Sequence, residues 1–126
     1  MALVQTGVVV LDCADPEELA EFYRQFLEAE DIEVSIDRVD IRAADGIRVA
    51  FRRDATATPP SWPRPEDSQQ AHLEFLVDDL DAAERAVIGL GGRSVSAGEM
   101  PGPNEERVCA DPAGHSFVLR HAKPRP

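Results

Sequence analysis

The sequence contains little cysteine and no cluster of cysteine and histidine typical of a metal or redox motif. Cys13 and Cys109 are the two cysteines among 126 residues, and they do not form a Cys-x-x-Cys pair. A zinc-ribbon or thioredoxin-type protein is therefore excluded. Both side chains are predicted to be buried thiols, because cysteine outside such motifs is among the most buried residue types.

Basic residues and long hydrophobic runs are scarce as well. Lys and Arg number 13 against 24 Asp and Glu, which gives a formal net charge of −11. Nucleic acids and anionic membranes bind basic surfaces, so neither is an expected partner. The amino-terminal residues lack a basic region, and their apolar run is too short for a signal peptide or a membrane span. The expected location is the cytoplasm.

The residues that are present form the same pattern twice, a strand followed by a helix and three strands. Asp15 precedes Pro16 as a helix N-cap, and apolar residues then recur at helical spacing. In the first half the pattern predicts a helix over 15–30 and strands over 5–13, 32–36, 38–43 and 47–53. In the second half it predicts a helix over 79–91 and strands over 71–77, 93–96, 105–110 and 115–121.

An internal repeat supports this division. Asp15 and Asp79 begin the two helices 64 positions apart, and Gly46 and Gly114 mark two turns 68 positions apart. The fold class is predicted to be α+β with two βαβββ modules. The whole chain, 1–126, is expected to form a single domain, with module one over about 1–54, a connector over about 55–70 and module two over about 71–126.

The connector is rich in proline and holds the only tryptophan, Trp62. Dense proline favours an extended, semi-rigid segment, and a long ordered connector is often functional. Trp62 is predicted either to anchor the connector or to lie at the rim of a cavity.

Alternation along the strands separates two faces of the predicted sheets. The apolar parity is expected to lie under the helices and comprises Val9, Leu11, Cys13, Val49, Phe51, Leu73, Phe75, Val77, Phe117 and Leu119. The other parity mixes aliphatic and ionisable side chains: Val8, Val10, Asp12, Arg48, Ala50, Arg52, His72, Glu74, Leu76, Ser116, Val118 and Arg120. A mixed face of this kind is typical of a small-molecule site.

Two interpretations of the ionisable residues stay open. Glu74 pairs with Arg52 or Arg120 across strands and His72 is only a hydrogen-bonded wall residue, or these groups bind a ligand. In the second case the arginines favour an anionic or carbonyl-bearing small molecule, because guanidinium matches carboxylate geometry. His115 is expected to be a turn residue with local hydrogen bonds, and His121 to be exposed.

The sequence as a whole resembles the glyoxalase-like branch of the vicinal oxygen chelate superfamily. The stretches LDCADPEELAEFYRQFL, PPSWPRP, HLEFLVDDLDAA and DPAGHSFVLRH carry this resemblance. The superfamily includes glyoxalases, dioxygenases, epimerases, fosfomycin-modifying enzymes and bleomycin resistance proteins. The resemblance implies two βαβββ modules and, since relatives form dimers, a homodimer.

The resemblance also implies four metal-ligand positions, which in this sequence are Val8, Ala50, His72 and Val118. Only His72 can bind a metal, whereas a divalent ion needs about three or four N, O or S ligands. No metal and no other cofactor is therefore expected. Glu74 and Asp12 could join His72 in a substitute site with two carboxylates, but such a site would lie well along the strands.

The expected function is small-molecule binding without a metal, in the manner of resistance proteins that sequester antibiotics. The expected ligand-binding residues are Asp12, Arg52, Trp62, His72, Glu74 and Arg120. The alternative is a lyase, isomerase or dioxygenase, either with substitute metal ligands or metal-free with Glu74 or His72 as the general base. A domain that binds no ligand and serves only for interaction is a third reading.

Overall fold

The computed structural model describes residues 3–56, 71–95 and 106–122. The chain divides into two compact units, Met1–Thr58 and Pro59–Pro126, and each unit is described by itself. Trp62 and the greater part of the predicted connector lie outside the described residues.

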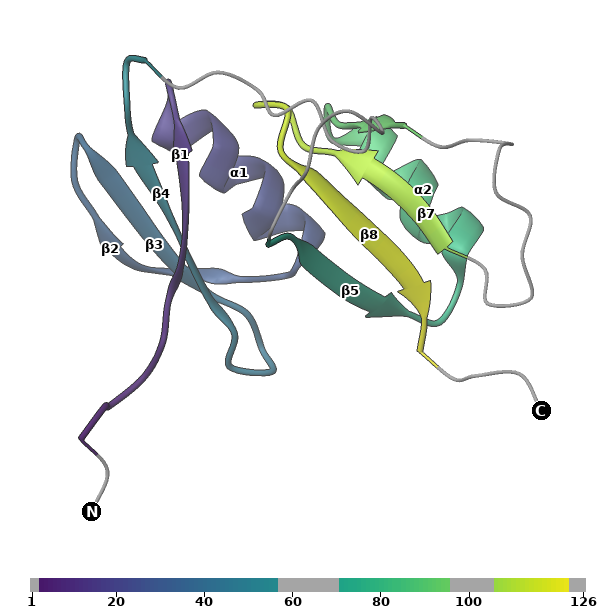
Figure 1. The fold of residues 1–126 in the computed structure, drawn as a ribbon, viewed down its shortest axis with the longest axis horizontal. Coiled ribbons are helices and arrows are strands. Elements are labelled where there is room, and N and C mark those ends of the chain that lie inside the picture. The colour runs from purple at the N-terminus through teal and green to yellow at the C-terminus, as the bar shows by residue number, and fades with distance from the viewer. Residues whose placement is uncertain (1–2, 57–70, 96–105, 123–126) are drawn as a thin grey trace. The chain divides into compact units, whose positions relative to one another are not determined.

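The first unit contains a four-stranded sheet and one helix (Figure 1). Its elements are β1 (Val9–Cys13), α1 (Pro16–Phe26), β2 (Glu30–Val34), β3 (Arg38–Arg42) and β4 (Arg48–Arg53). The strand order is β1-β4-β3-β2, with β1 parallel to β4 and the other neighbours antiparallel.

The second unit repeats this architecture. Its elements are β5 (Leu73–Val77), α2 (Leu80–Gly89), β6 (Arg93–Ser94), β7 (Glu106–Ala110) and β8 (Ser116–His121). The strand order is β5-β8-β7-β6, and β5 is parallel to β8. The predicted fold class, α+β with two βαβββ modules, is confirmed.

The two units share individual hydrogen bonds at the spacings that the repeat predicts. The backbone N–H of Asp54 donates to Cys13, and that of Ala122 donates to Val77, each at 2.8 Å. The turns before β4 and β8 are equally alike, because Gly46 and Gly114 have φ values of 99° and 97°. Only glycine adopts this backbone region at no steric cost, so the same turn requires glycine in both units.

Both helices begin where the sequence predicts. The Asp15 side chain accepts a hydrogen bond from the Glu18 N–H at 3.2 Å, and the Asp79 side chain accepts from the Ala82 N–H at 3.0 Å. Each aspartate satisfies one backbone donor at a helix start, which is the function of an N-cap. Within the described ranges, neither helix is long and apolar enough to cross a membrane.

Both helices end earlier than predicted. The prediction of 15–30 is wrong because the chain turns at Glu28, whose φ of 51° is the left-handed conformation. The next N–H, that of Ala29, donates back to Arg24 at 2.9 Å and so closes the helix. In α2 the helix ends at Gly89 and not at 91; Gly91 adopts φ 105°, and the Gly92 N–H donates back to Val87.

The early end of α1 also corrects the first predicted hairpin. Because the chain reverses at Glu28, β2 occupies 30–34 and not 32–36. The strand predicted over 71–77 begins at Leu73, so His72 precedes β5 and does not belong to it. β6 is shorter than predicted, although the Val95 N–H still donates to Val108.

The predicted apolar parity lies under the helices, most completely at the central strands. Val49, Phe51, Phe117 and Leu119 have no exposed surface, and Tyr23 of α1 stacks on Phe51 with ring centroids 5.4 Å apart. The outer strands are less covered. Leu73, Phe75 and Val77 of β5 are half-buried, because α2 packs mainly against β6, β7 and β8. Val9 at the start of β1 is exposed.

The helix ends offer a matched test of the left-handed conformation. We expect Glu28→Gly to raise the free energy of unfolding by about 0.5–1 kcal/mol. The left-handed conformation costs a non-glycine residue about 1–2 kcal/mol, and the larger conformational entropy that glycine loses on folding offsets part of the gain from removing this cost. We expect Gly91→Ala to lower it by about 1 kcal/mol, because only the backbone is strained. An added Cβ at Gly91 would meet Pro112 Cγ at an ordinary 3.6 Å.

Urea unfolding of both variants and the wild-type protein measures these changes. Equal stability of all three would contradict the assignment of Glu28 as a strained helix end.

Candidate functional site

Each sheet has a face that points away from its own helix, here called the distal face. Residues that are direct partners across strands share a face, so the strand register assigns its members. In the first unit the distal face comprises Val10, Asp12, Arg38, Asp40, Arg42, Arg48, Ala50 and Arg52. In the second unit it comprises Glu74, Leu76, Glu106, Val108, Ala110, Ser116, Val118 and Arg120.

The two units place an arginine at the same position of their fourth strand. Arg52 Nε lies 2.9 Å from Asp12 Oδ1, and Arg120 Nε lies 2.9 Å from Glu74 Oε2. The expectation that Glu74 has an arginine partner is confirmed, and that arginine is Arg120. In both pairs the carboxylate comes from the first strand of the same unit.

These two ion pairs are accessible to solvent. The side chains are 56% and 42% exposed in the Arg52–Asp12 pair, and 46% and 37% exposed in the Arg120–Glu74 pair. Exposed pairs contribute about 0–1 kcal/mol to stability. Four charged side chains are thus kept on accessible surfaces where their contribution to folding is small.

Three of the four positions at which the resemblance implies metal ligands carry no donor atom, and only His72 does. Ala50 is fully buried and Val118 is 5% exposed, and neither side chain has an atom with a lone pair for a metal. Val8 is half-buried, and His72 is exposed ahead of β5. The described residues contain no group of three or more His, Cys, Asp or Glu side chains that could hold a metal ion. The donor set does not fit a divalent metal.

A buried carboxylate at the centre of the first distal face was not predicted. Asp40 of β3 is 4% exposed and lies directly opposite Ala50 of β4. Arg38 donates to both of its oxygens, from Nε at 2.7 Å and from Nη2 at 3.2 Å. Arg48 Nη2 lies 3.5 Å from Asp40 Oδ2.

This cluster also affects the protonation of Arg38. The hydrogen bond to Asp40 raises the pKa of Arg38, an effect that partial burial opposes. Arg38 is therefore a permanent cation, and its fork holds the Asp40 carboxylate in one orientation. The available signal in the sequence was the alternation in RVDIR, where Val39 and Ile41 face the helix and the charged residues do not.

The second distal face is more apolar at its centre. Val118 of β8 has Val108 and Glu74 as its direct strand partners, and Val118 is almost fully buried. Leu76 is 56% exposed on the same face. The two faces thus differ at their centres, which hold the charged Asp40 in the first unit and the aliphatic Val118 in the second.

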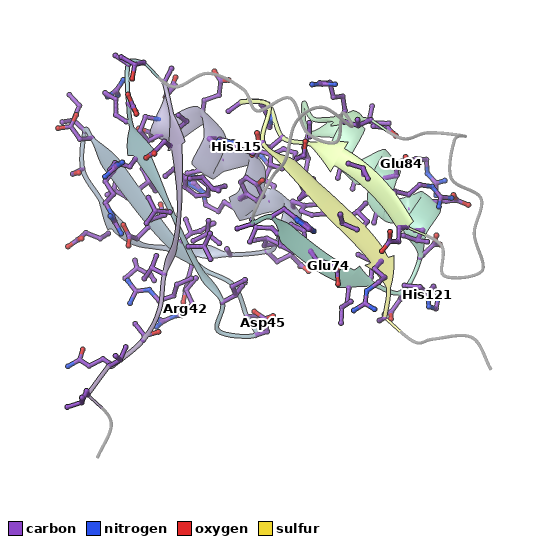
Figure 2. The ribbon with its side chains drawn as sticks, viewed as in Figure 1. Arg42, Asp45, Glu74, Glu84, His115 and His121 are labelled. Atoms are coloured by element: carbon purple, nitrogen blue, oxygen red, sulfur yellow. The ribbon has the colours of Figure 1, made fainter. Side chains whose placement is uncertain are left out.

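The remaining histidines are explained by local structure. Asp111 accepts backbone hydrogen bonds from Ala113 and His115 at 2.9 and 3.0 Å, and its Oδ2 lies 3.0 Å from His115 Nδ1. His115 is a turn residue, as predicted. His121 ends β8 and is half-buried, which corrects the prediction that it is exposed. His115 and His121 lie at opposite ends of this strand (Figure 2).

The cysteines are both buried, as predicted. Burial, with a smaller contribution from Glu84, raises the pKa of the Cys109 thiol to about 11. The thiolate is the reactive form of cysteine, so Cys109 is inert at neutral pH and is not a candidate nucleophile.

Comparison with known proteins identifies the family. The family model described as "Glyoxalase-like domain" matches residues 8–120, a range that includes both βαβββ units. The chain belongs to this glyoxalase-like family, which lies within the vicinal oxygen chelate superfamily. No curated protein sequence gives a significant match.

Solved structures agree on the fold. A glyoxalase/bleomycin resistance protein/dioxygenase family enzyme from Burkholderia phytofirmans PsJN has a TM-score of 0.71 and 17% identity, with 92% of this chain and 97% of that one covered. The fosfomycin resistance protein FosX from Mesorhizobium loti has a TM-score of 0.68 and 18% identity, with coverage of 98% and 95%.

FosX from Listeria monocytogenes, complexed with Mn(II) and sulfate ion, has a TM-score of 0.67 and 15% identity, with coverage of 98% and 95%. At these identities the likeness shows the fold alone.

The burial of Asp40 predicts a stability difference between two carboxylates on one face. We expect Asp40→Asn to lower the free energy of unfolding by about 1–3 kcal/mol, because the buried network loses its negative charge and one of the two oxygens that accept from Arg38. Asp12→Asn should cost less than about 1 kcal/mol, because the Asp12–Arg52 pair is exposed. Urea unfolding at low and high salt measures both. Equal costs would show that Asp40 is not the structural centre of the face.

Proposed function

We propose that this protein binds an anionic or carbonyl-bearing small molecule through the distal faces of its sheets and uses no metal to do so. The two βαβββ units, together 1–126, would act as one glyoxalase-like domain. The observation that carries the proposal is the composition of these faces. Arginines are kept on accessible surface, while three of the four family ligand positions hold Val8, Ala50 and Val118.

The physical argument concerns what the arginines are for. Exposed ion pairs add little to stability, so Arg52 and Arg120 are poorly explained as structural residues. A guanidinium presents several donors in a rigid fork that matches carboxylate and carbonyl oxygens. Aliphatic side chains such as Leu76 and Val118 would supply the apolar contacts that small-molecule sites also need.

The six residues predicted to bind a ligand differ in the structural observations that support them. Asp12, Arg52, Glu74 and Arg120 are proposed as ligand-binding residues because they lie on distal faces and are part-exposed. His72 stays a proposal on weaker ground, since it precedes β5. Trp62 stays a prediction from the sequence, because it lies outside the described residues.

One observation favours the alternative of a metal-free lyase or isomerase. Glu74 places a part-exposed carboxylate 2.9 Å from a guanidinium, which brings a candidate base next to a group that stabilises developing negative charge. In that case Glu74→Gln would abolish turnover and leave ligand affinity nearly unchanged. In a binding protein the same substitution would alter affinity alone. The metal-dependent dioxygenase reading has no comparable support, because the donor set is lacking.

Substitution of the distal arginines tests the binding proposal. A thermal-shift screen of small carboxylates, phosphates and carbonyl compounds would identify a ligand of the wild-type protein. We expect Arg52→Ala, Arg120→Ala and His72→Ala each to weaken its binding, by about tenfold or more for the arginines, since hydrogen bonds to charged groups contribute about 1.5–3 kcal/mol. Titration calorimetry measures the affinities, with Arg85→Ala on the exposed surface of α2 as the control. Wild-type affinity in all the variants would refute the proposal.

Addition of metal tests the proposed absence of a metal site. We expect zinc, nickel and manganese to leave the unfolding midpoint of the purified protein unchanged, because Val8, Ala50 and Val118 provide no donor atoms. A ligand that binds only the native state would add about 2.7 kcal/mol at 100 times its dissociation constant. A stabilisation by one of these ions that His72→Ala abolishes would contradict the proposal.

A further inference from the structure

Arg48, at the start of β4, is a partly buried and weakly paired charged side chain of the first distal face. Its Nε is buried and has no hydrogen-bond partner within the part of the chain that the structure describes. Its one ion pair with the residues in 3–56, 71–95 and 106–122 joins Nη2 to Asp40 Oδ2 at 3.5 Å, a long contact. The side chain as a whole is 26% exposed, so part of it contacts solvent although Nε does not.

Asp40 cannot satisfy Arg48 because it is already committed to Arg38. Arg38 donates Nε and Nη2 to the two Asp40 oxygens at 2.7 and 3.2 Å, a side-on fork. Charge-assisted bonds of this length and bidentate geometry are the strong ones, whereas a 3.5 Å contact is weak. The carboxylate therefore fixes Arg38, and the positive charge of Arg48 is left with little compensation.

Among the described residues, the two nearest strand neighbours of Arg48 on this face, Arg42 and Ala50, have no side-chain acceptor. Arg42 of β3 is its direct cross-strand partner, and like charges at directly opposed positions repel. In the described part of the chain, Arg42 forms an ion pair only with the well-exposed Glu30, at 3.7 Å. Arg42 is seen near the β3–β4 turn in Figure 2. The next residue of β4 on this face, Ala50, offers a methyl group.

We propose that Arg48 anchors an anion-binding site on the first distal face, which takes the carboxylate or phosphate group of a small molecule. The inference rests on the proposed function and assigns a specific anchor to it. An oxygen of the anion would accept from Arg48 Nε–H and Nη2–H, which lie on one edge of the guanidinium. Arg38 binds the Asp40 carboxylate in the same manner, through the corresponding Nε–H and Nη2–H edge of its own guanidinium.

Binding in this way requires Arg48 to move, because its Nε is buried. The long Arg48–Asp40 contact is lost, and the part-exposed guanidinium turns its Nε edge toward the incoming anion. Asp40 stays on Arg38, so the buried carboxylate keeps its partner. The anion also lowers the repulsion between Arg48 and Arg42 across the strands.

Arg24 provides an internal control. It is the other arginine whose Nε is buried and has no hydrogen-bond partner among the described residues. Two carboxylates flank it, however, with Glu21 at 3.0 Å and Asp31 at 3.2 Å. An anion would be repelled there, so an unsatisfied Nε alone should not bind one.

Side-chain ¹⁵N NMR of arginine Nε–H groups tests the proposal directly. The ¹⁵N-labelled full chain would be titrated with pyruvate and with inorganic phosphate, with neutral methyl pyruvate and matched sodium chloride as controls. We expect the Arg48 Nε–H signal, assigned by its loss in Arg48→Lys, to shift saturably with at least one of the two anions. The Arg24 signal should not shift.

Arg48→Lys keeps the charge and the aliphatic stem but removes the Nε edge. Backbone amides of β4 would report its affinity, which should be at least about tenfold weaker than that of the wild type. Arg24→Lys should bind as the wild type does. Comparison of pyruvate with phosphate distinguishes a carboxylate site from a phosphate site.

Three results would overturn the assignment: equal shifts of Arg48 and Arg24, shifts that sodium chloride reproduces, or unchanged affinity in Arg48→Lys. If a ligand from the screen is weakened by Arg52→Ala or Arg120→Ala but not by Arg48→Lys, the proposed function stands and the Arg48 site is refuted.

Discussion

The parallel pairing of the first and fourth strands is the constraint on which both units depend. In the first unit Asp12 is the direct strand partner of Arg52. In the second unit Glu74 is the direct partner of Val118, which is two residues before Arg120 on β8. Because side chains alternate along a strand, a shift of the register by one residue would exchange the apolar and the charged faces. The N-capped helix that follows each first strand covers the apolar face. The same pairing therefore fixes the hydrophobic core and the distal face together.

Electrostatics on the two distal faces is organised at two levels of burial. Asp40 is buried and is held by a two-point fork from Arg38, so this pair orders the centre of the first sheet. The Arg52–Asp12 and Arg120–Glu74 pairs are exposed and contribute little to folding. The buried charges that order the sheet are thus separated from the exposed charges that contribute little to folding. Arg48 belongs to neither group: it is partly exposed, and its ion pair with the buried Asp40 is long, at 3.5 Å.

Membership of the glyoxalase-like family fixes the fold but leaves the chemistry open, because one fold supports many activities. Two of the four positions at which the resemblance implies metal ligands, Ala50 and Val118, lie on β4 and β8, the strands that pair in parallel with β1 and β5. In this chain Ala50 and Val118 are buried there as parts of the sheet interior, so the strands keep their geometry without any donor atom. The consequence is a scaffold whose polar groups are arginines and carboxylates. Under the proposed function, recognition by such a surface would depend on charge and on directional hydrogen bonds.

The sequence by itself determined the two βαβββ modules, the helix starts at Asp15 and Asp79, the glycine turns and the apolar parity of the central strands. Each of these depends on local propensity, capping or alternation, which neighbouring residues express directly. The tertiary structure decided where α1 ends, because no local rule places a glutamate in the left-handed conformation of Glu28. It also decided that His72 precedes β5 and that Asp40 is buried between two arginines. Such contacts join side chains brought together by strand pairing, and their burial depends on cross-strand neighbours that alternation along a single strand does not reveal.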